Sequence, residues 1–199
     1  MKIFALGRSV ESSVLIKKGN QADRLRSAFC FVKGVEELVL ITGGERSGKS
    51  SYALKLASSM GRKKAFIATA VAFDEEMNER IVRHRQERDK TFETIEEPIY
   101  IEEALRKTSN YDVRLIECMT TWMGNIIHKG LNVNKRVNAF LNELKGNEVI
   151  VTNEVGMGII PMRVETRRYV EALGRLNQKL ANIASEVYMM VCGIAVKIK

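Results

Sequence analysis

One stretch of the chain has the residue types and the spacing of a loop that binds phosphate groups. The segment from Thr42 to Ser51 reads TGGERSGKSS and matches the pattern G-x-x-x-x-G-K-[ST] completely. Glycines in such a loop let successive main-chain N–H groups turn toward one anion, and the helix that follows adds positive potential. In this pattern Lys49 reaches the outer phosphates of a nucleotide, and the Ser50 hydroxyl is placed to hold Mg²⁺. A chance glycine turn is the alternative, but the apolar run before the loop and the helical pattern after it favour phosphate binding.

A carboxylate later in the chain is a second candidate for nucleotide chemistry. Glu117 follows the mostly apolar run of residues 113–116, which is typical of a buried strand. P-loop enzymes place an acid at the end of such a strand, beside the loop, where it holds Mg²⁺ or its water. A solvated carboxylate at the end of a strand gives the same pattern, so the spacing alone favours neither interpretation.

A histidine among arginines is the third candidate. His84 lies in a predicted helix from Asp74 to about Arg88, on the face that also carries Met77 and Ile81. A lone histidine on such a face is more often structural than catalytic. However, arginines stand nearby at positions 80, 83, 85 and 88, and their charge would disfavour protonation and keep the imidazole a neutral nucleophile. The alternative is a solvated face on which these arginines pair with glutamates. The other histidine, His128, has no such setting, and we interpret it as structural.

Two further features lie later in the chain. Asn153 and Glu154 follow an apolar run and precede a loop with glycines at 156 and 158. In a parallel sheet, ligands lie beyond the carboxyl ends of the strands, which favours a binding role over an ordinary loop. Gly174 lies inside a long predicted helix, where it either allows close packing of another helix or subunit or is neutral.

The elements that must position these residues alternate along the chain. Apolar runs predict strands at residues 38–41, 64–70 with the closing turn, 91–95, 113–117 and 148–153, with one or two more within 187–196. Helical patterns cover residues 49–60, 74–88, 99–107, 121–129, 134–145 and 165–185. Such alternation predicts an α/β fold, in which helices cover both faces of a mostly parallel sheet.

The composition fits one domain with an appendage. Of the 199 residues, 45% are hydrophobic, which is enough for a sizeable core. Residues 38–199 form the predicted nucleotide-binding domain, and residues 1–37 form an N-terminal extension. The three cysteines contain no C-x-x-C pair, and an odd number fits a reducing compartment. Because we find neither a membrane span nor a signal-peptide core, we expect a cytoplasmic protein.

The charge balance favours anionic partners. A formal net charge of +8 suits either nucleotide phosphates or nucleic acid. Aromatic residues are only 7% of the chain and do not interleave with a basic run, so we predict a concentrated phosphate site and no nucleic acid. Two other functions remain open at this point. They are a small-molecule P-loop kinase that forms no covalent intermediate, and a RecA-like ATPase that binds nucleic acid.

Several motifs in order resemble one enzyme family. They are TGGERSGKS at residues 42–50, IATA at 67–70, DEEM at 74–77 with the later His84-Arg85, TNEVGMGIIP at 152–161 and GRLNQ at 174–178. This set is similar to the bifunctional adenosylcobinamide kinase / adenosylcobinamide-phosphate guanylyltransferase of cobalamin biosynthesis. The resemblance covers residues 38–199 and leaves out residues 1–37. It implies a RecA-like P-loop NTPase fold, a homotrimer, and the use of ATP, GTP and Mg²⁺.

The resemblance also implies two reactions and the residues that serve them. A phosphoryl group passes from ATP or GTP to adenosylcobinamide, and GMP then passes from GTP to adenosylcobinamide phosphate through a covalent guanylyl-histidine. The matching histidine is His84. The catalytic residues implied are His84 and Lys49, and the metal ligands are Ser50 and Glu117. The nucleotide-binding residues implied are Gly43, Gly44, Glu45, Arg46, Ser47, Gly48, Lys49, Ser50, Ala68, Thr69, Ala70, Arg85, Gln86, Glu87, Arg88, Glu96 and Glu117. One departure from the family pattern affects a polar contact, because Met162 stands where an acid is common.

Overall fold

The computed structural model describes residues 37–72, 75, 78–79, 82 and 91–199. The chain divides into two units, residues 1–30 and 31–199, and every described residue lies in the second. The predicted N-terminal extension therefore falls almost entirely outside the described residues, and its boundary with the nucleotide-binding domain stays a prediction. None of the described helices is both long enough and apolar enough to cross a bilayer.

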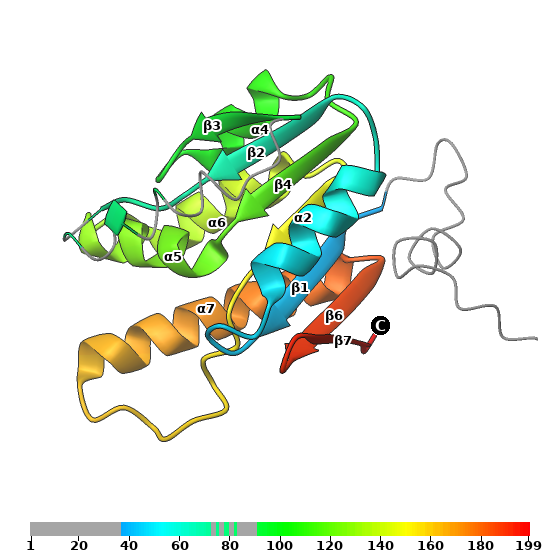
Figure 1. The fold of residues 1–199 in the computed structure, drawn as a ribbon. Helices are drawn as coiled ribbons and strands as arrows, with labels where there is room; N and C mark the ends of the chain where they lie inside the picture. The colour runs from blue at the N-terminus through cyan, green and yellow to red at the C-terminus, as the bar shows by residue number, and fades with distance from the viewer. Residues whose placement is uncertain (1–36, 73–74, 76–77, 80–81, 83–90) are drawn as a thin grey trace, which may run out of the picture. The chain divides into compact units, whose positions relative to one another are not determined.

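The strands of the described part form one mixed sheet (Figure 1). Their bounds are β1 Val39–Gly43, β2 Lys64–Ala68, β3 Phe92–Glu96, β4 Val113–Glu117, β5 Glu148–Val151, β6 Glu186–Val191 and β7 Ile194–Lys197. The order across the sheet is β3-β2-β4-β5-β1-β6-β7. All neighbouring strands pair in parallel except β6 and β7, which form an antiparallel hairpin at one edge. The predicted mostly parallel sheet is confirmed.

The helices cover the sheet unequally. Helix α2 (Lys49–Ser59) packs against β1, β4 and β5 on one face (Figure 1). The other face carries α4 (Ile101–Lys107), α5 (Met119–His128), α6 (Val133–Asn142) and α7 (Val164–Ile183). Alternate strand residues explain the two layers, because Leu40, Ile116 and Ile150 join the core beneath α5 and α7. Their chain neighbours, such as Ile41, point to the α2 side and are also buried. Helices on both faces were predicted, and this is confirmed.

The connections from strand to helix change face at one point in the sheet. The helix after β1 lies on one face, and the helices after β4 and β5 lie on the other. In open α/β sheets a ligand binds beyond the carboxyl ends of the strands, at the point where the crossovers change face. The loop from Gly43 to Gly48 leaves β1 at this point, so the fold brings the predicted phosphate site to the expected edge.

The opposite end of the sheet is fixed by a buried ion pair. Arg114 on β4 and Glu148 on β5 are both fully buried, and the Arg114 Nη2 atom lies 2.5 Å from Glu148 Oε1. The same carboxylate accepts the main-chain N–H groups of Lys145, Gly146 and Asn147. Burial lowers the pKa of the Arg114 guanidinium, and the charge of Glu148 opposes that shift. This pair joins β4 to β5 at the end of the sheet away from the phosphate loop.

Candidate nucleotide-binding site

The loop after β1 has the backbone geometry that an anion cradle requires. Gly48 has a φ of 94°, and Arg46 has a φ of 55°, so the chain turns through left-handed conformations between strand and helix. Gly48 is the N-cap of α2 and offers no side-chain acceptor, and the first turn of the helix holds no carboxylate. The N–H groups at this helix end are therefore left without an acidic cap, as in sites where a bound anion caps them.

Lys49 is held over the same loop. Its side chain is mostly buried, and its Nζ atom lies 2.5 Å from the carbonyl oxygen of Gly44 and 3.5 Å from Ser47 Oγ. The ammonium group thus lies within the curve of the loop, where the phosphates of a nucleotide would meet it. This position agrees with the role that the sequence pattern predicts for Lys49.

The β6–β7 hairpin braces the loop from the side. The Gly193 N–H, between the two strands, donates to the Ser47 carbonyl at 3.0 Å. Gly43 lies so close to β6 that an added Cβ atom would come within 2.5 Å of the Met190 carbonyl oxygen. An added Cβ at Gly48 would lie 3.2 Å from the Gly193 Cα atom. Gly43 and Gly48 therefore allow close packing against the β6–β7 hairpin in addition to shaping the phosphate loop. The sequence pattern did not predict this packing.

Ser50 and Glu117 meet beside the loop. The Ser50 hydroxyl, in the first turn of α2, donates to a carboxylate oxygen of Glu117 at the carboxyl end of β4. Both side chains are half-buried, and they bring hydroxyl and carboxylate oxygens together. The sequence left the role of Glu117 open, and this contact favours a part in the site over a solvated carboxylate.

A buried polar network holds the ends of β2 and β4 together. Thr69 is fully buried, and its hydroxyl accepts the Cys118 N–H at 2.8 Å and lies 2.7 Å from Thr121 Oγ1. Its N–H donates to the Glu117 carbonyl. The Asn125 amide, from α5, donates to the carbonyls of Thr69 and Pro98. Thr69, expected to contact a nucleotide, therefore has its hydroxyl committed to Cys118 and Thr121, while its N–H bonds to the main chain of Glu117. Asn125 had no distinguishing sequence signal, because a lone asparagine in a helix is common.

A second chain of hydrogen bonds links α7 to the loop. The Thr152 hydroxyl donates to Asn177 Oδ1 at 2.8 Å, and the Asn177 amide donates to the Asn153 carbonyl at 3.1 Å. The Asn153 amide in turn donates to Glu45, an exposed residue of the phosphate loop, at 3.3 Å. The Glu154 N–H donates to the Gly43 carbonyl. Asn153 and Glu154 therefore lie beside the phosphate loop, and their binding role stays a prediction. Asn177, in the GRLNQ motif, contacts both Thr152 and Asn153.

The remaining predicted residues are less central. Ala68 is buried at the end of β2, and the neighbouring Ala70 is exposed. Glu96 is exposed at the end of β3, the outer strand farthest from β1 within the parallel part of the sheet. Five predicted residues lie outside the described residues: His84, Arg85, Gln86, Glu87 and Arg88.

The fold and site define a nucleotide-binding α/β protein of the P-loop class. A phosphate cradle, a lysine and a serine–carboxylate pair lie together at the carboxyl ends of parallel strands. A family model described as "Cobinamide kinase / cobinamide phosphate guanyltransferase" matches residues 39–198. The chain belongs to this family, and it is a cobinamide kinase and cobinamide-phosphate guanylyltransferase of cobalamin biosynthesis that uses nucleotide substrates.

Relatives of known name support the assignment over almost their whole length. A "Bifunctional adenosylcobalamin biosynthesis protein CobP" from Pseudomonas aeruginosa is 36% identical over an alignment of 166 residues, and the match covers 80% of this chain and 96% of the relative. A "Bifunctional adenosylcobalamin biosynthesis protein CobU" from Escherichia coli strain K12 is 36% identical over an alignment of 181 residues, and the match covers 81% of this chain and 99% of the relative.

Some solved structures show a distant similarity to this chain. They include a KaiC-like protein from the hyperthermophilic archaeon Pyrococcus horikoshii OT3, with a TM-score of 0.39, 15% identity, and coverage of 77% of this chain and 70% of that chain. The RadB recombinase has a TM-score of 0.42 and 16% identity, covering 77% of this chain and 74% of that chain. The fold class itself follows from the strand order and the crossovers described above.

Proposed function

We propose that the guanylyl transfer of this enzyme passes through GMP bound covalently to His84. The family assignment establishes that GMP is transferred, and the motif order places a histidine followed by arginine after the second strand. In the first step an imidazole nitrogen attacks the α-phosphorus of GTP, and the bond to the β-phosphate oxygen breaks to release pyrophosphate. In the second step a phosphate oxygen of adenosylcobinamide phosphate attacks the same phosphorus, and the P–N bond breaks to restore His84. A covalent intermediate divides one transfer into two easier displacements.

The described residues supply the electrostatic part of both reactions. Main-chain N–H groups of the loop and the Lys49 ammonium group would bind the phosphates of ATP or GTP. In the kinase reaction the adenosylcobinamide hydroxyl attacks the γ-phosphorus, and charge develops on oxygens that this cradle faces. The single observation that carries the proposal is that Lys49, Ser50 and Glu117 converge at the carboxyl end of β1 and β4 in a chain of this family.

Ser50 and Glu117 also fit a magnesium ion. Mg²⁺ prefers oxygen ligands, and it is commonly held by one or two carboxylates together with the phosphates of the substrate. The hydrogen bond between Ser50 and Glu117 brings two such oxygens together beside the cradle. No cluster of three or more His, Cys, Asp or Glu side chains that could hold a metal occurs within the described residues, which suits an ion that relies on nucleotide oxygens. Bound there, Mg²⁺ would neutralise charge on the phosphates.

Labelling tests the covalent step directly. The protein is incubated with Mg²⁺ and GTP labelled at the α-phosphorus, and it is then denatured and counted. We expect acid-labile label on the wild type and on His128→Ala, and none on His84→Ala, because His128 is the only other histidine in the chain. GTP labelled at the γ-phosphorus should leave no label. Label retained by His84→Ala would remove this residue from the mechanism.

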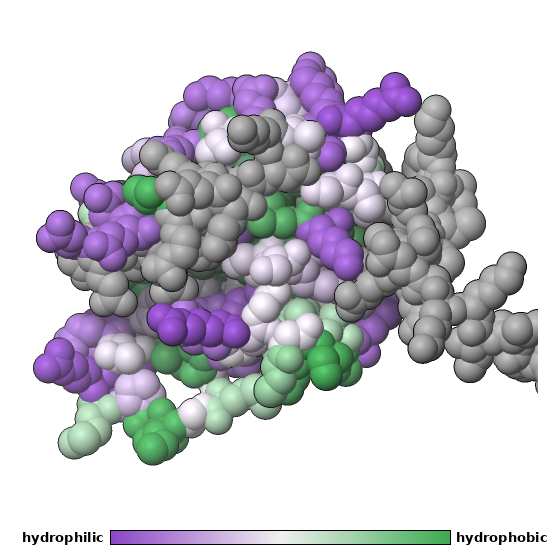
Figure 2. Space-filling view, in the orientation of Figure 1, coloured by the Kyte–Doolittle hydropathy of each residue, from purple (hydrophilic) through white to green (hydrophobic). Residues whose placement is uncertain are grey.

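We also propose that the active form is a homotrimer, as the family resemblance implies. The loop between β5 and α7 exposes Met157, Ile159, Ile160 and Met162 by 77%, 98%, 79% and 95%. Figure 2 shows apolar surface gathered at the lower edge of the view, where this loop lies in Figure 1. The Arg167 guanidinium donates to the carbonyls of Pro161 and Met162 and so holds the loop in shape. Apolar side chains as exposed as these, gathered in one loop, support an interaction surface there.

The oligomeric state tests this second proposal. Light scattering after size-exclusion chromatography should give three times the chain mass of 22.5 kDa for the wild type. The double variant Ile159→Asp/Ile160→Asp should elute as a smaller species, whereas Lys135→Ala, on exposed helix surface, should remain a trimer. A monomeric wild type, or a trimer unaffected by the aspartates, would contradict the proposal.

A further inference from the structure

A cavity between α6 and α7 lies apart from the nucleotide site. Its volume is about 370 Å³, which is within the range of small-molecule sites. Both helices pack on the sheet face opposite α2, whereas the phosphate loop leads into α2. The residues that bind the nucleotide phosphates therefore do not line this cavity.

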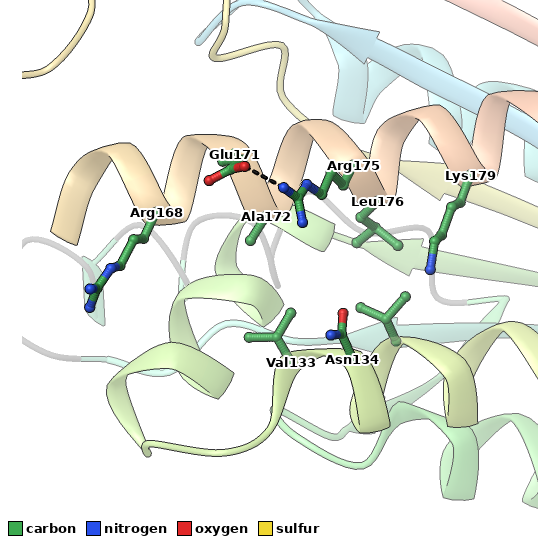
Figure 3. Close-up of a pocket in the computed structure, with 9 residues that line it drawn as sticks. Val133, Asn134, Arg168, Glu171, Ala172, Arg175, Leu176 and Lys179 are labelled. Atoms are coloured by element: carbon green, nitrogen blue, oxygen red, sulfur yellow. Dashed lines mark hydrogen bonds and ion pairs between the residues drawn. The ribbon is translucent and has the colours of Figure 1, made fainter. Parts of the chain in front are cut away.

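The floor of the cavity is apolar and its rim is cationic (Figure 3). Val137 and Leu176, both buried, line it together with Ala172. Figure 3 shows Ala172, Leu176 and Lys179 pointing from α7 toward α6. Arg175 lies on the same stripe of α7, one helical turn before Lys179, or about 6 Å along the axis. A ligand here would meet hydrocarbon below and positive charge above.

The charges at the rim are not balanced by the residues that the structure describes. Three cationic side chains line the cavity, from Arg168, Arg175 and Lys179, against one carboxylate, from Glu171. Glu171 is paired with Arg175 one turn away, and both are exposed. Within the described part of the chain, Arg168 and Lys179 take part in none of the ion pairs. The first turn of α6, which begins at the cavity with Val133 and Asn134, also holds no acid. A net positive rim of this kind attracts an anion.

We propose that this cavity binds a small organic phosphate, with the phosphate group at Arg175 and Lys179 and an apolar body on the floor. Arginine and lysine one turn apart can both donate to phosphate oxygens, and such charge-assisted hydrogen bonds are stronger than neutral ones. The volume of about 370 Å³ lies in the range of small-molecule sites and therefore favours a small molecule over a protein segment. The proposal concerns a site distinct from the nucleotide site and does not rest on the role of His84.

Phenyl phosphate is a suitable probe, because it joins a phosphate monoester to an apolar ring. Its binding to the full chain is measured by calorimetry in a Lys49→Ala background, which weakens any binding at the phosphate loop. We expect saturable binding at one site per chain, at least tenfold tighter than that of inorganic phosphate. Binding should weaken at least tenfold when Arg175→Ala/Lys179→Ala is added. A matched cation on the exposed surface of α6, changed in Lys135→Ala, should leave it unchanged.

Each contrary outcome would overturn the proposal. These outcomes are the absence of saturable binding in the Lys49→Ala protein, equal affinity for phenyl phosphate and inorganic phosphate, and an unchanged affinity in the Arg175→Ala/Lys179→Ala protein. Chemical shifts of backbone amides provide a second measurement that needs no rim variant. Perturbations must map to Val133, Asn134 and Ala172, and perturbations confined to the phosphate loop would place the ligand elsewhere.

Discussion

Gly43→Ala is the substitution that most directly tests how the phosphate loop is held. Gly43 is the last residue of β1 and has a φ of 143°, a conformation that residues with a Cβ atom rarely adopt. The new Cβ would lie 2.5 Å from the Met190 carbonyl oxygen and 2.9 Å from Ser47 Oγ. The Met190 oxygen belongs to the backbone of β6, so it can move only if the strand or the loop moves.

The expected cost has two parts. A strained backbone conformation costs about 1–3 kcal/mol, and an added methyl group in a packed region costs about 1–3 kcal/mol. Together they amount to about 2–6 kcal/mol. This cost falls on folding if β6 moves and on nucleotide binding if the phosphate loop moves. If β6 shifts, unfolding becomes easier. If the loop shifts, the cradle loses its shape, and even 2 kcal/mol lowers nucleotide affinity by about 30-fold.

Thermal unfolding and GTP binding are therefore measured together. For a chain of this length, about 1 kcal/mol corresponds to roughly 2–4 °C in Tm, so the combined loss should be readily visible. Gly44→Ala is the matched control, because its added Cβ would meet nothing within 4 Å and its φ lies outside the left-handed region. The reasoning is refuted if Gly43→Ala keeps both wild-type Tm and wild-type affinity, or if Gly44→Ala is equally damaging.

Three further predictions concern the polar groups that hold the sheet. Glu148→Gln should leave the buried Arg114 cation without its counterion, and the free energy of unfolding measured in urea should fall by about 3–5 kcal/mol. The GTP affinity of the folded protein should not change. A variant as stable as the wild type would contradict the structural role of the pair. Asn177→Ala should cost about 1–3 kcal/mol, because Thr152 and Asn153 lose a partner, and it should weaken GTP binding more than the exposed neighbour Gln178→Ala does. If both variants weaken GTP binding equally, the hydrogen bonds of Asn177 do not link α7 to the phosphate loop. Hydrogen bonds from the main-chain N–H groups of Lys63 and Arg62 lower the pKa of Asp112. The stability that this carboxylate contributes is therefore present above its unfolded pKa of about 4, and it is lost as the pH falls through the folded pKa. The Tm difference between wild type and Asp112→Ala should accordingly shrink from pH 7 to pH 3, and a constant difference would show that the carboxylate charge is not involved.

Much of the fold could be predicted from the sequence because local signals and burial agree. The run at residues 113–117 is a buried strand whose pattern is unambiguous, and the structure gives the same bounds. The glycine at 61 follows α2, which ends at Ser59, close to its predicted end. Strand ends were predicted less closely, because β5 ends at Val151, two residues before the predicted end. The strand order could not be predicted, since nothing in a short apolar run specifies its neighbours.

The site was predictable only where a motif fixes the chemistry. Lys49 and Ser50 follow from the pattern itself. Glu117 was a candidate whose spacing left two interpretations open, because only the tertiary fold brings a residue of β4 to the start of α2. Asn125 and Gly193 could not have been found from the sequence. Each acts through contacts with main-chain groups that are remote in the chain, and neither stands in a distinctive pattern.

The hydrogen bonds of Thr69 bear on how the proposed nucleophile is positioned relative to the proposed metal ligand. Phosphoryl transfer occurs at the γ-phosphorus, whereas guanylyl transfer occurs at the α-phosphorus. The guanylyl transfer therefore needs a nucleophile placed beside a different phosphorus atom of the nucleotide. The segment that contains His84 leaves the sheet after Thr69, whose N–H and hydroxyl are bonded to the main chain of Glu117 and Cys118. The chain leading to the proposed nucleophile therefore starts from a point fixed against the proposed metal ligand. Disturbing Thr69 should affect guanylyl transfer as well as phosphoryl transfer, because the same buried bonds fix Glu117 and the start of that segment.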